Sequence, residues 1–355
     1  MPLPEPWSGG FSLSGALLRW QRQHGRQDLP WQNTQDPYRV WLSEIMLQQT
    51  QVVTVGEYFQ RFLAQFPDVR ALAEASLDSV LALWAGLGYY SRARNLHRCA
   101  QDVMRLHGGA FPRSASQLQT LPGIGPSTAA AIASLCFAER VAILDGNVKR
   151  VLTRFLGFDA DLAQAANLRR LWQLANELLP QDALATDMPR YTQGIMDLGA
   201  TVCTAKKPDC DVCPLQAHCQ ARARANPGKF PVNTRKLKRS AQSIWMLWAQ
   251  ADDGALWLDQ RPTPGVWAGL YCFALFNDRA ELLLAVPGIL SAQLRDESAF
   301  KHVLTHKDLY LHPVRVLLPR TCQPVARGAW IDAHQWPQLG LPKPIRKLLN
   351  GEPGR

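Results

Sequence analysis

The stretch Leu121-Pro122-Gly123-Ile124-Gly125-Pro126-Ser127-Thr128-Ala129 decides the first half of the fold. Gly123 and Gly125 predict a tight turn in which the backbone can come close to a ligand. A helix is expected to begin at Ser127 or Thr128, and its unpaired N–H groups would then face that ligand, as at phosphate-binding helix starts. A plain turn between two helices is equally compatible with these residues.

Helical sequence surrounds this turn on both sides, up to about Ala225. Apolar residues recur at spacings of three and four, which predicts amphipathic helices, and Pro and Gly separate them. The first part of the chain is therefore predicted to be mainly α-helical. The clearest helical stretches are Phe11–Gln23, Tyr38–Gln49, Val52–Phe66, Leu77–Leu83, Ser91–Leu106, Ser127–Phe137 and Asn147–Phe155.

The pattern changes after residue 225. Residues 226–240 are basic and carry no helical apolar stripe, so they are predicted to be a linker, either a solvated tether or a contact for a phosphate backbone. Beyond it, Asp253-Gly254 between two apolar runs predicts a β-hairpin, and Leu309–Leu318 predicts another strand. The predicted domains are 1–225, the linker at 226–240, and a smaller α+β domain at 241–355.

Length and charge limit the class of protein. A chain of 355 residues exceeds one typical core and predicts two domains. Lys and Arg outnumber Asp and Glu by 39 to 29, and this excess favours a polyanionic partner through counterion release. No apolar run is long enough for a membrane span, and residues 1–10 lack the pattern of a signal peptide. We expect a monomeric, cytoplasmic protein without a membrane partner.

Four cysteines are clustered with the spacing C-x6-C-x2-C-x5-C, at Cys203, Cys210, Cys213 and Cys219. Thiolates are soft ligands, and four of them suit either zinc or an iron–sulfur cluster. Spacing alone leaves both metals open, and His218 is a possible substitute for one cysteine. The other four cysteines stand among apolar residues and are expected to be buried free thiols.

Two carboxylates are candidates for catalysis. On a helix, Glu44 would have apolar neighbours such as Val40 and Leu47, and partial desolvation would raise its pKa toward the range of a general acid. The alternative is an exposed glutamate on an amphipathic helix. Asp145 follows an apolar run and precedes Gly146 and Asn147; it could stabilise a developing cation or simply cap the next helix.

Five motifs in order resemble the adenine DNA glycosylase family of the helix–hairpin–helix glycosylases. They are Leu42–Gln51, Gly86–Tyr90, Leu121–Gly125, Ile143–Val148 and the four cysteines. The resemblance implies a helix–hairpin–helix glycosylase domain in two helical lobes, with a [4Fe–4S] cluster held by the cysteines. It also implies a Nudix-like α+β domain at the C-terminal end.

The family's roles can be transferred where the motifs match. Glu44 would protonate N7 of adenine, and Asp145 would stabilise the oxocarbenium-like sugar before water completes hydrolysis, a division of labour known from glycoside hydrolysis. The adenine must leave the helical stack to reach them. Double-stranded DNA that contains adenine opposite 8-oxoguanine or guanine is therefore the implied partner, and base excision repair the implied process.

Further residues are implied to contact this DNA. Gln48, Gln49 and Tyr89 match residues that fill the duplex and contact the lesion strand, and Trp31 and Gln193 match the lining of the adenine pocket. In the C-terminal domain, Phe300–His306 stands in the place of a loop that reads 8-oxoguanine through Thr305 and His306. The set implied to bind DNA or substrate is completed by Gly123, Gly125, Ser127 and Asn147.

Ser127 separates two related enzyme classes. Lyase-competent relatives such as endonuclease III have a Lys at this place, which forms a Schiff base with the sugar. Serine cannot do so, and the resemblance therefore implies a monofunctional glycosylase. The alternatives are an endonuclease III-like glycosylase/lyase and a non-enzymatic iron–sulfur protein that binds DNA.

Overall fold

The computed structural model describes residues 11–181, 186–235, 238–286, 288–289 and 291–351. Contacts within the chain divide it into two compact units. Unit 1 comprises residues 1–73 and 98–235, and unit 2 comprises residues 74–97 and 236–355. The two units are described separately below.

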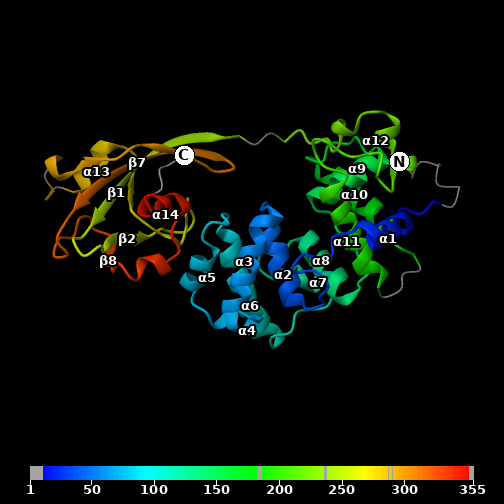
Figure 1. The fold of residues 1–355 in the computed structure, drawn as a ribbon, viewed down its shortest axis with the longest axis horizontal. Helices are drawn as coiled ribbons and strands as arrows, with labels where there is room; N and C mark the ends of the chain where they lie inside the picture. Colours follow the sequence, from blue (N-terminus) through cyan, green and yellow to red (C-terminus); the bar gives the residue numbers. More distant parts are fainter. Residues whose placement is uncertain (1–10, 182–185, 236–237, 287, 290, 352–355) are drawn as a thin grey trace. The chain divides into compact units, whose positions relative to one another are not determined.

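Unit 1 is built from helices, among which α1, α8 and α9 pack against α11 (Figure 1). Helix α11 contacts α1, α8 and α9, while α2 contacts α3 and α8. The small side chains of Ala129, Ala130, Ala131 and Ala133 make α8 narrow, so its neighbours can approach it closely and bury it. The helices that lie wholly or mainly in this unit are α1 (Leu13–His24), α2 (Pro37–Leu47), α3 (Val52–Gln65), α4 (Val69–Glu74), α7 (Ala115–Leu118), α8 (Pro126–Phe137), α9 (Gly146–Leu156), α10 (Ala165–Glu177), α11 (Asp187–Thr201) and α12 (Gln220–Ala223).

The predicted helices are confirmed, with ends that shift by at most two residues, and cap chemistry explains the shifts at α1 and α2. Ser12 caps α1 with its side chain, so this helix begins at Leu13 and not at Phe11. Asp36 caps α2, and Pro37 occupies its first turn, where a missing N–H costs nothing. Residues of α6 (Ser91–His107) belong to both units.

Unit 2 contains a mixed β-sheet in the order β3-β2-β1-β7-β5, with β4, β6 and β8 paired at its sides. The predicted hairpin around Asp253-Gly254 is confirmed by the antiparallel pair β1 and β2. Strand β1 also runs parallel to β7 along its whole length, from Ser240↔Lys307 to Gln250↔Leu317. The strands are β1 (Ser240–Gln250), β2 (Leu256–Gln260), β3 (Tyr271–Cys272), β4 (Ala274–Phe276), β5 (Arg295–Asp296), β6 (Phe300–Val303), β7 (Lys307–Leu317) and β8 (Ala329–Ile331).

Helices complete unit 2. Leu282 of α13 (Arg279–Ala285) is buried in a core with Leu247 of β1 and Val314 of β7. A further helix, α14 (Lys343–Leu349), follows β8, and α5 (Leu77–Trp84) comes from the early part of the sequence. In this division of the chain, residues 74–97 group with the C-terminal residues.

The first part of the predicted linker, residues 226–235, packs against unit 1 and is therefore not a solvated tether. Phe230 is buried, Arg154 donates to the Pro227 carbonyl oxygen at 2.9 Å, and Thr234 bonds to Asp161. Residues 226–235 are thus attached to unit 1, whereas residues 236–237 lie outside the described part of the chain. Arg239, at the start of the second part, pairs with Asp308.

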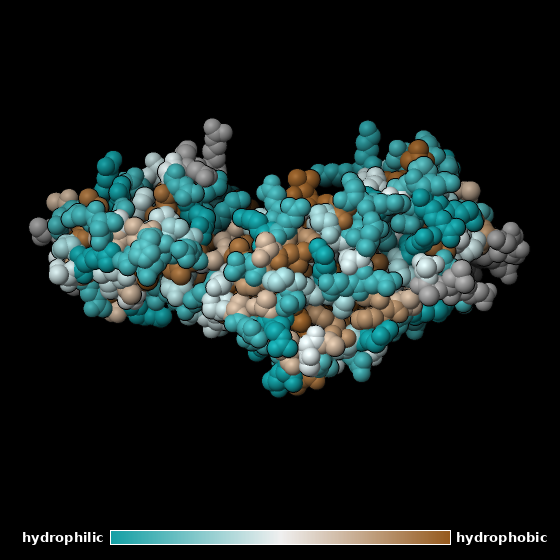
Figure 2. Space-filling view, turned by 60° about the horizontal axis from the view of Figure 1, so that its bottom comes forward, coloured by the Kyte–Doolittle hydropathy of each residue, from teal (hydrophilic) through white to brown (hydrophobic). Residues whose placement is uncertain are grey.

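The surface is largely hydrophilic. Figure 2 shows hydrophilic residues over most of the visible face, with apolar residues in small separate patches. The most exposed large apolar side chains are those of Val53 and Leu284, which come from different units. Among the described residues, no helix is both long and apolar enough to cross a membrane.

Candidate active site and iron–sulfur site

Glu44 lies on α2 and is half-buried rather than exposed, although it is flanked by the fully buried Ser43 and Ile45. Burial raises the pKa of its carboxyl from 4.5 to about 7, and the nearby negative charge of Asp145 adds to this rise. No group in the described part of the chain hydrogen-bonds to this carboxyl. Glu44 can therefore hold a proton near neutral pH and offer it to a ligand.

Asp145 lies directly before α9 and is both the helix cap and the second candidate carboxylate. Its Oδ1 accepts a hydrogen bond from the Val148 N–H at 2.7 Å. Burial raises its pKa, while the N–H groups of Val148 and Asn147 and the cations Arg150 and Lys149 act in the opposite direction. These donors stabilise the charged form of Asp145, and Glu44 lacks such donors.

The two carboxyls are close enough for the charge of one to act on the other, although Glu44 and Asp145 are about a hundred residues apart in sequence. Burial raises the pKa of both carboxyls, and at Asp145 backbone N–H groups and nearby cations oppose the rise. A neutral acid beside a carboxylate can protonate a leaving group and stabilise a developing cation. The predicted pair is thus brought together, and the alternative of an exposed Glu44 is wrong.

The turn between α7 and α8 has the geometry that its glycines predict. Gly123 adopts a φ of +77°, which an L side chain rarely tolerates. Gly125 caps α8 without a side chain and has open space on the side where a Cβ would lie. The turn is tied to α2, because Gln48 Nε2 donates to Thr128 Oγ1 at 3.4 Å, and Ser127 lies half-buried beside it.

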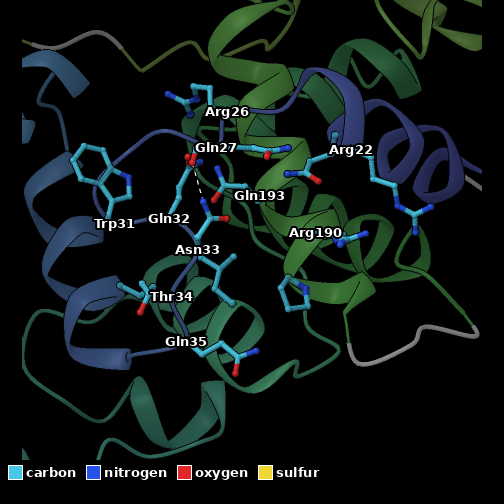
Figure 3. Close-up of a pocket in the computed structure, with 14 residues that line it drawn as sticks. Arg22, Arg26, Gln27, Trp31, Gln32, Asn33, Thr34, Gln35, Arg190 and Gln193 are labelled. Carbon is cyan, nitrogen blue, oxygen red and sulfur yellow. Dashed lines mark hydrogen bonds between the residues drawn. The ribbon is translucent and has the colours of Figure 1, made fainter.

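Trp31 and Gln193 line one cavity of about 600 Å³ in unit 1 (Figure 3). Trp31 is buried and belongs to the segment 26–35, whereas Gln193 belongs to α11. Val40, one helical turn before Glu44, lines the same cavity. Two residues predicted to share a base pocket are therefore neighbours in the fold.

Asn147 lies in the first turn of α9, where its side-chain oxygen accepts a hydrogen bond from Arg150 at 2.8 Å. The same Arg150 donates to the carbonyl oxygens of Gly199 and Cys203, at 2.6 and 2.8 Å. A Cβ on Gly199 would lie 2.7 Å from the Asn147 Cβ. The start of α9, with Asp145, is thus held tightly against α11.

The four predicted cysteines line one small cavity in unit 1, and all are half-buried free thiols. Within the described ranges, no three His, Cys, Asp or Glu residues are grouped closely enough to hold a single metal ion. Four soft thiol ligands around a shared space suit a zinc ion or an iron–sulfur cluster. His218 is engaged elsewhere, since its ring stacks on Phe11 at 4.0 Å.

Arg154 contributes a buried positive charge beside this cavity. Its guanidinium donates to the Cys203 Sγ at 3.4 Å and to the carbonyl oxygens of Thr204, Ala205 and Pro227. A thiolate-bound cluster is negatively charged, so a buried arginine with carbonyl partners fits it. When bound, the cluster would cross-link the 203–219 loop to the rest of unit 1.

Unit 2 brings together two predicted lesion-contact residues. The hydroxyls of Tyr89 and Thr305 are hydrogen-bonded to each other, and both residues line a cavity of about 430 Å³ that Trp267 and His302 share. His306 lines it too and is exposed. Tyr89, like Gln49 in unit 1, has a left-handed backbone, with φ of +48° and +58° respectively, which non-glycine residues seldom adopt.

Comparisons with known proteins agree with this picture. Residues 42–177 match the family described as HhH-GPD superfamily base excision DNA repair protein. Residues 203–219 match the iron–sulfur binding domain of endonuclease III, and residues 244–351 match the NUDIX domain.

Whole-chain relatives extend the comparison. The chain is 35% identical to the adenine DNA glycosylase of Buchnera aphidicola subsp. Acyrthosiphon pisum, over 96% of this chain and 97% of that protein. It is 45% identical to the human adenine DNA glycosylase over 60% of this chain and 40% of the human protein. The solved structure of a thermostable thymine-DNA glycosylase aligns with a TM-score of 0.52 and 26% identity, covering 59% of this chain and 95% of that one.

The helical fold, the glycine turn, the paired carboxylates and the cysteine motif define a DNA glycosylase of base excision repair, with a [4Fe–4S] cluster and a Nudix-like C-terminal domain. Because a relative aligned over almost the whole chain exceeds 30% identity, the chain belongs to the adenine DNA glycosylase family.

The structure also shows residues that the sequence did not single out. Asp197 of α11 is fully buried and binds Gln193 and Arg26. Its spacing of four from Gln193 places both on one helix face, a signal present in the sequence. The pairing with Arg26, at a separation of 171 residues, has no such signal.

Proposed function

We propose that this protein hydrolyses the N-glycosidic bond of adenine that lies opposite 8-oxoguanine or guanine in double-stranded DNA. The observation that carries the proposal is the pair of Glu44 and Asp145, in which burial and mutual charge raise the Glu44 pKa to about 7. The family relationship supports adenine as the base, since the relatives aligned with the chain are adenine DNA glycosylases.

In the proposed reaction, Glu44 gives its proton to N7 of the flipped adenine. The C1′–N9 bond breaks, its electron pair leaves with the base, and the sugar becomes an oxocarbenium-like cation. The Asp145 carboxylate stabilises this cation until water adds to C1′ and loses a proton. Ser127 provides no amine, so the sugar is not captured as a Schiff base. With DNA as substrate and reduced thiols as ligands, the protein would act in the cytoplasm.

The direct test is single-turnover base release from duplexes with adenine opposite 8-oxoguanine, guanine or cytosine. We expect release with the first two, and loss of at least about a hundredfold in rate in Glu44→Gln and Asp145→Asn, as general acid and electrostatic catalysis each contribute this much. Both variants preserve side-chain size, and duplex binding should persist. Unchanged rates in both would favour the non-enzymatic DNA-binding alternative.

Preference for 8-oxoguanine is proposed to depend on the pair of Tyr89 and Thr305, because their bonded hydroxyls line the unit 2 cavity. Thr305→Val keeps the shape but removes the hydroxyl. It should lower the rate ratio of 8-oxoguanine to guanine as the opposite base, by roughly tenfold or less, the contribution of one hydrogen bond. The matched control is Thr234→Val, which removes an exposed hydroxyl in unit 1. An unchanged ratio in Thr305→Val would contradict the role.

A further inference from the structure

We infer that Arg94 is a positioning residue for the preference between 8-oxoguanine and guanine. By binding the Ala268 carbonyl oxygen, Arg94 fixes the Trp267 side chain as a wall of the unit 2 cavity that Thr305 also lines. The inference rests on the proposed function and goes beyond it, because it names the residue that holds this wall in place.

The turn between β2 and β3 holds Trp267 in a backbone conformation that few residues adopt. Its φ is +58°, in the left-handed region, which costs free energy in a residue that has a Cβ. The residue is nevertheless buried. A backbone of this kind persists only where the surrounding contacts hold it, so the contacts of this turn decide where the Trp267 ring lies.

Arg94 supplies one of these contacts. It lies in the first turn of α6, and its Nη1 donates to the Ala268 carbonyl oxygen at 2.6 Å. Ala268 is buried, and within the described ranges no other group donates to this oxygen. Without the guanidinium a buried acceptor would be left unpaired, and the turn would have to change shape to bring it to water.

A second attachment holds the far end of the same turn. Gln260 Nε2 donates to the Gly269 carbonyl oxygen and to Asp78 Oδ1, both at 3.2 Å, and the Tyr271 hydroxyl donates to Asp78 Oδ2 at 3.3 Å. Asp78 belongs to α5, so helices from the early part of the sequence hold the turn at two places. The bond from Arg94 is the one that reaches the residue directly after Trp267.

Trp267 connects this turn to the loop that is proposed to read the lesion. Its ring centroid lies 6.0 Å from that of His302, with the ring planes tilted by 48°. His302 belongs to β6, which leads into the loop that carries Thr305. Both rings and Thr305 line the same cavity of about 430 Å³. If Trp267 moved, the end of β6 would lose its packing partner and the Thr305 hydroxyl would change its place.

The test measures single-turnover release of adenine opposite 8-oxoguanine and opposite guanine in Arg94→Met. Methionine keeps apolar volume but has no donor for the Ala268 oxygen. Because a hydrogen bond weakens steeply when its geometry is lost, the rate should fall more opposite 8-oxoguanine than opposite guanine. We expect the ratio of the two rates to fall by about three- to tenfold, the scale of one hydrogen bond. Arg94→Lys keeps a charged donor and should restore most of the ratio.

The matched control is Arg346→Met. Arg346 is also a half-buried arginine of unit 2 that donates to backbone carbonyl oxygens, those of Pro337 and Leu339 at 3.1 and 2.8 Å. It does not line the cavity. This variant should keep the wild-type ratio, and an equal fall of the ratio in both variants would contradict a special role of Arg94.

A double-mutant cycle tests whether Arg94 acts through Trp267. In a Trp267→Ala background the wall is absent, so Arg94→Met should then change the ratio by less than about twofold. A merely structural role of Arg94 would lower both rates equally and would persist in that background. Either of these results, or an unchanged ratio in Arg94→Met alone, would overturn the inference.

Fluorine NMR of protein labelled with 5-fluorotryptophan tests the positioning step without DNA. The Trp267 signal, assigned through its loss in Trp267→Phe, should shift in Arg94→Met and stay in place in Arg346→Met. An unmoved signal in Arg94→Met would reject the contact as the support of Trp267. If thermal unfolding shows that Arg94→Met does not fold, Arg94→Gln, whose shorter amide ends before the Ala268 oxygen, replaces it with the same expected results.

Failure of the proposed function has a different signature. Wild type would then release no adenine, or would release it equally fast opposite 8-oxoguanine and guanine. The Trp267 signal would still report whether Arg94 holds the turn.

Discussion

Glu44 is distinguished from a surface glutamate by the pH at which it changes charge. The folded pKa is about 7 and the ordinary value is 4.5, so between these values the folded state binds more protons than the unfolded state. Stability therefore falls as pH rises through this window and stays lower above it. The protonated form is also the form that can act as a general acid, so the excision rate should fall above pH 7.

The fall in stability with rising pH gives a prediction for Glu44→Gln. The substitution removes the cost of a buried charge, and the free energy of unfolding at pH 8 should rise by up to roughly 3 kcal/mol. At pH 4.5 the two proteins should be nearly equal. Denaturant unfolding at both pH values measures the difference, with the exposed Glu57→Gln as control. A variant that is less stable than wild type at pH 8 would contradict the pKa of Glu44.

Ser127 carries a second prediction at this scale. Wild type incubated with a mispaired duplex and borohydride should give no efficient covalent trapping, because a hydroxyl cannot form a reducible Schiff base. Ser127→Lys places an amine at the half-buried start of α8 and should produce a trapped complex. Efficient trapping by the unaltered protein would show that another amine reaches the sugar.

Some residues of the candidate site could be predicted from the sequence, and others could not. The residues around Glu44 and Asp145 left an exposed glutamate and a plain helix cap open, and their catalytic roles were expected from the family resemblance. Asp197 was not predicted, since a buried carboxylate in a helix is expected only when its cation is known, and Arg26 is distant in sequence. For Ser127 and the cysteines, residue type indicated a missing amine and a metal centre, and the family resemblance implied the monofunctional class and the iron–sulfur cluster.

At the scale of elements, the contact between α9 and α11 fixes the position of Asp145, the proposed catalytic carboxylate. Gly199→Ala would place a Cβ 2.7 Å from Asn147 Cβ and 3.1 Å from the Asn147 carbonyl oxygen, so the helices must separate. We expect a loss of about 1–3 kcal/mol in stability, the usual cost of overpacking, and a slower excision rate as Asp145 moves.

The matched control is Gly56→Ala in α3, where a Cβ would meet nothing within 4 Å. That substitution should stabilise the protein by about 0.4–1 kcal/mol, because alanine loses less backbone entropy in a helix. Thermal unfolding and single-turnover excision measure both variants. If Gly199→Ala behaved like its control, the tight packing of α9 on α11 would have no energetic consequence.

Helix ends and the hairpin could be predicted from the sequence, whereas the pairing of distant strands could not. Helix ends follow local capping groups such as Ser12 and Asp36, so the sequence places them to within a few residues. The hairpin of β1 and β2 is also local. The parallel pairing of β1 with β7 joins residues more than sixty positions apart, and no short pattern specifies such a partner.

At the scale of the whole molecule, the net charge of +10 predicts salt-dependent binding to duplex DNA. Lys206 and Lys207 are exposed on the loop that follows Cys203. If the cluster holds this loop against DNA, replacing both lysines by alanine should reduce the slope of log affinity against log salt by about 2.

The control removes two exposed charges elsewhere in unit 1, in Arg19→Ala with Arg169→Ala. Its slope should change less than that of the lysine variant. Visible absorption of the cluster should be the same in both proteins, which separates a lost contact from a lost cofactor. Equal slopes for the two variants would show that the loop lysines have no special contact.

The membership of residues 74–97 in unit 2 has a consequence for synthesis on the ribosome. A Cβ on Gly340 would lie 2.9 Å from the Leu81 Cβ, so α5 completes its packing against residues about 260 positions later in the chain. At roughly 5–20 residues per second, that partner emerges some 13 to 50 seconds after α5. The nascent chain must carry the apolar face of α5 without its packing partner through this interval.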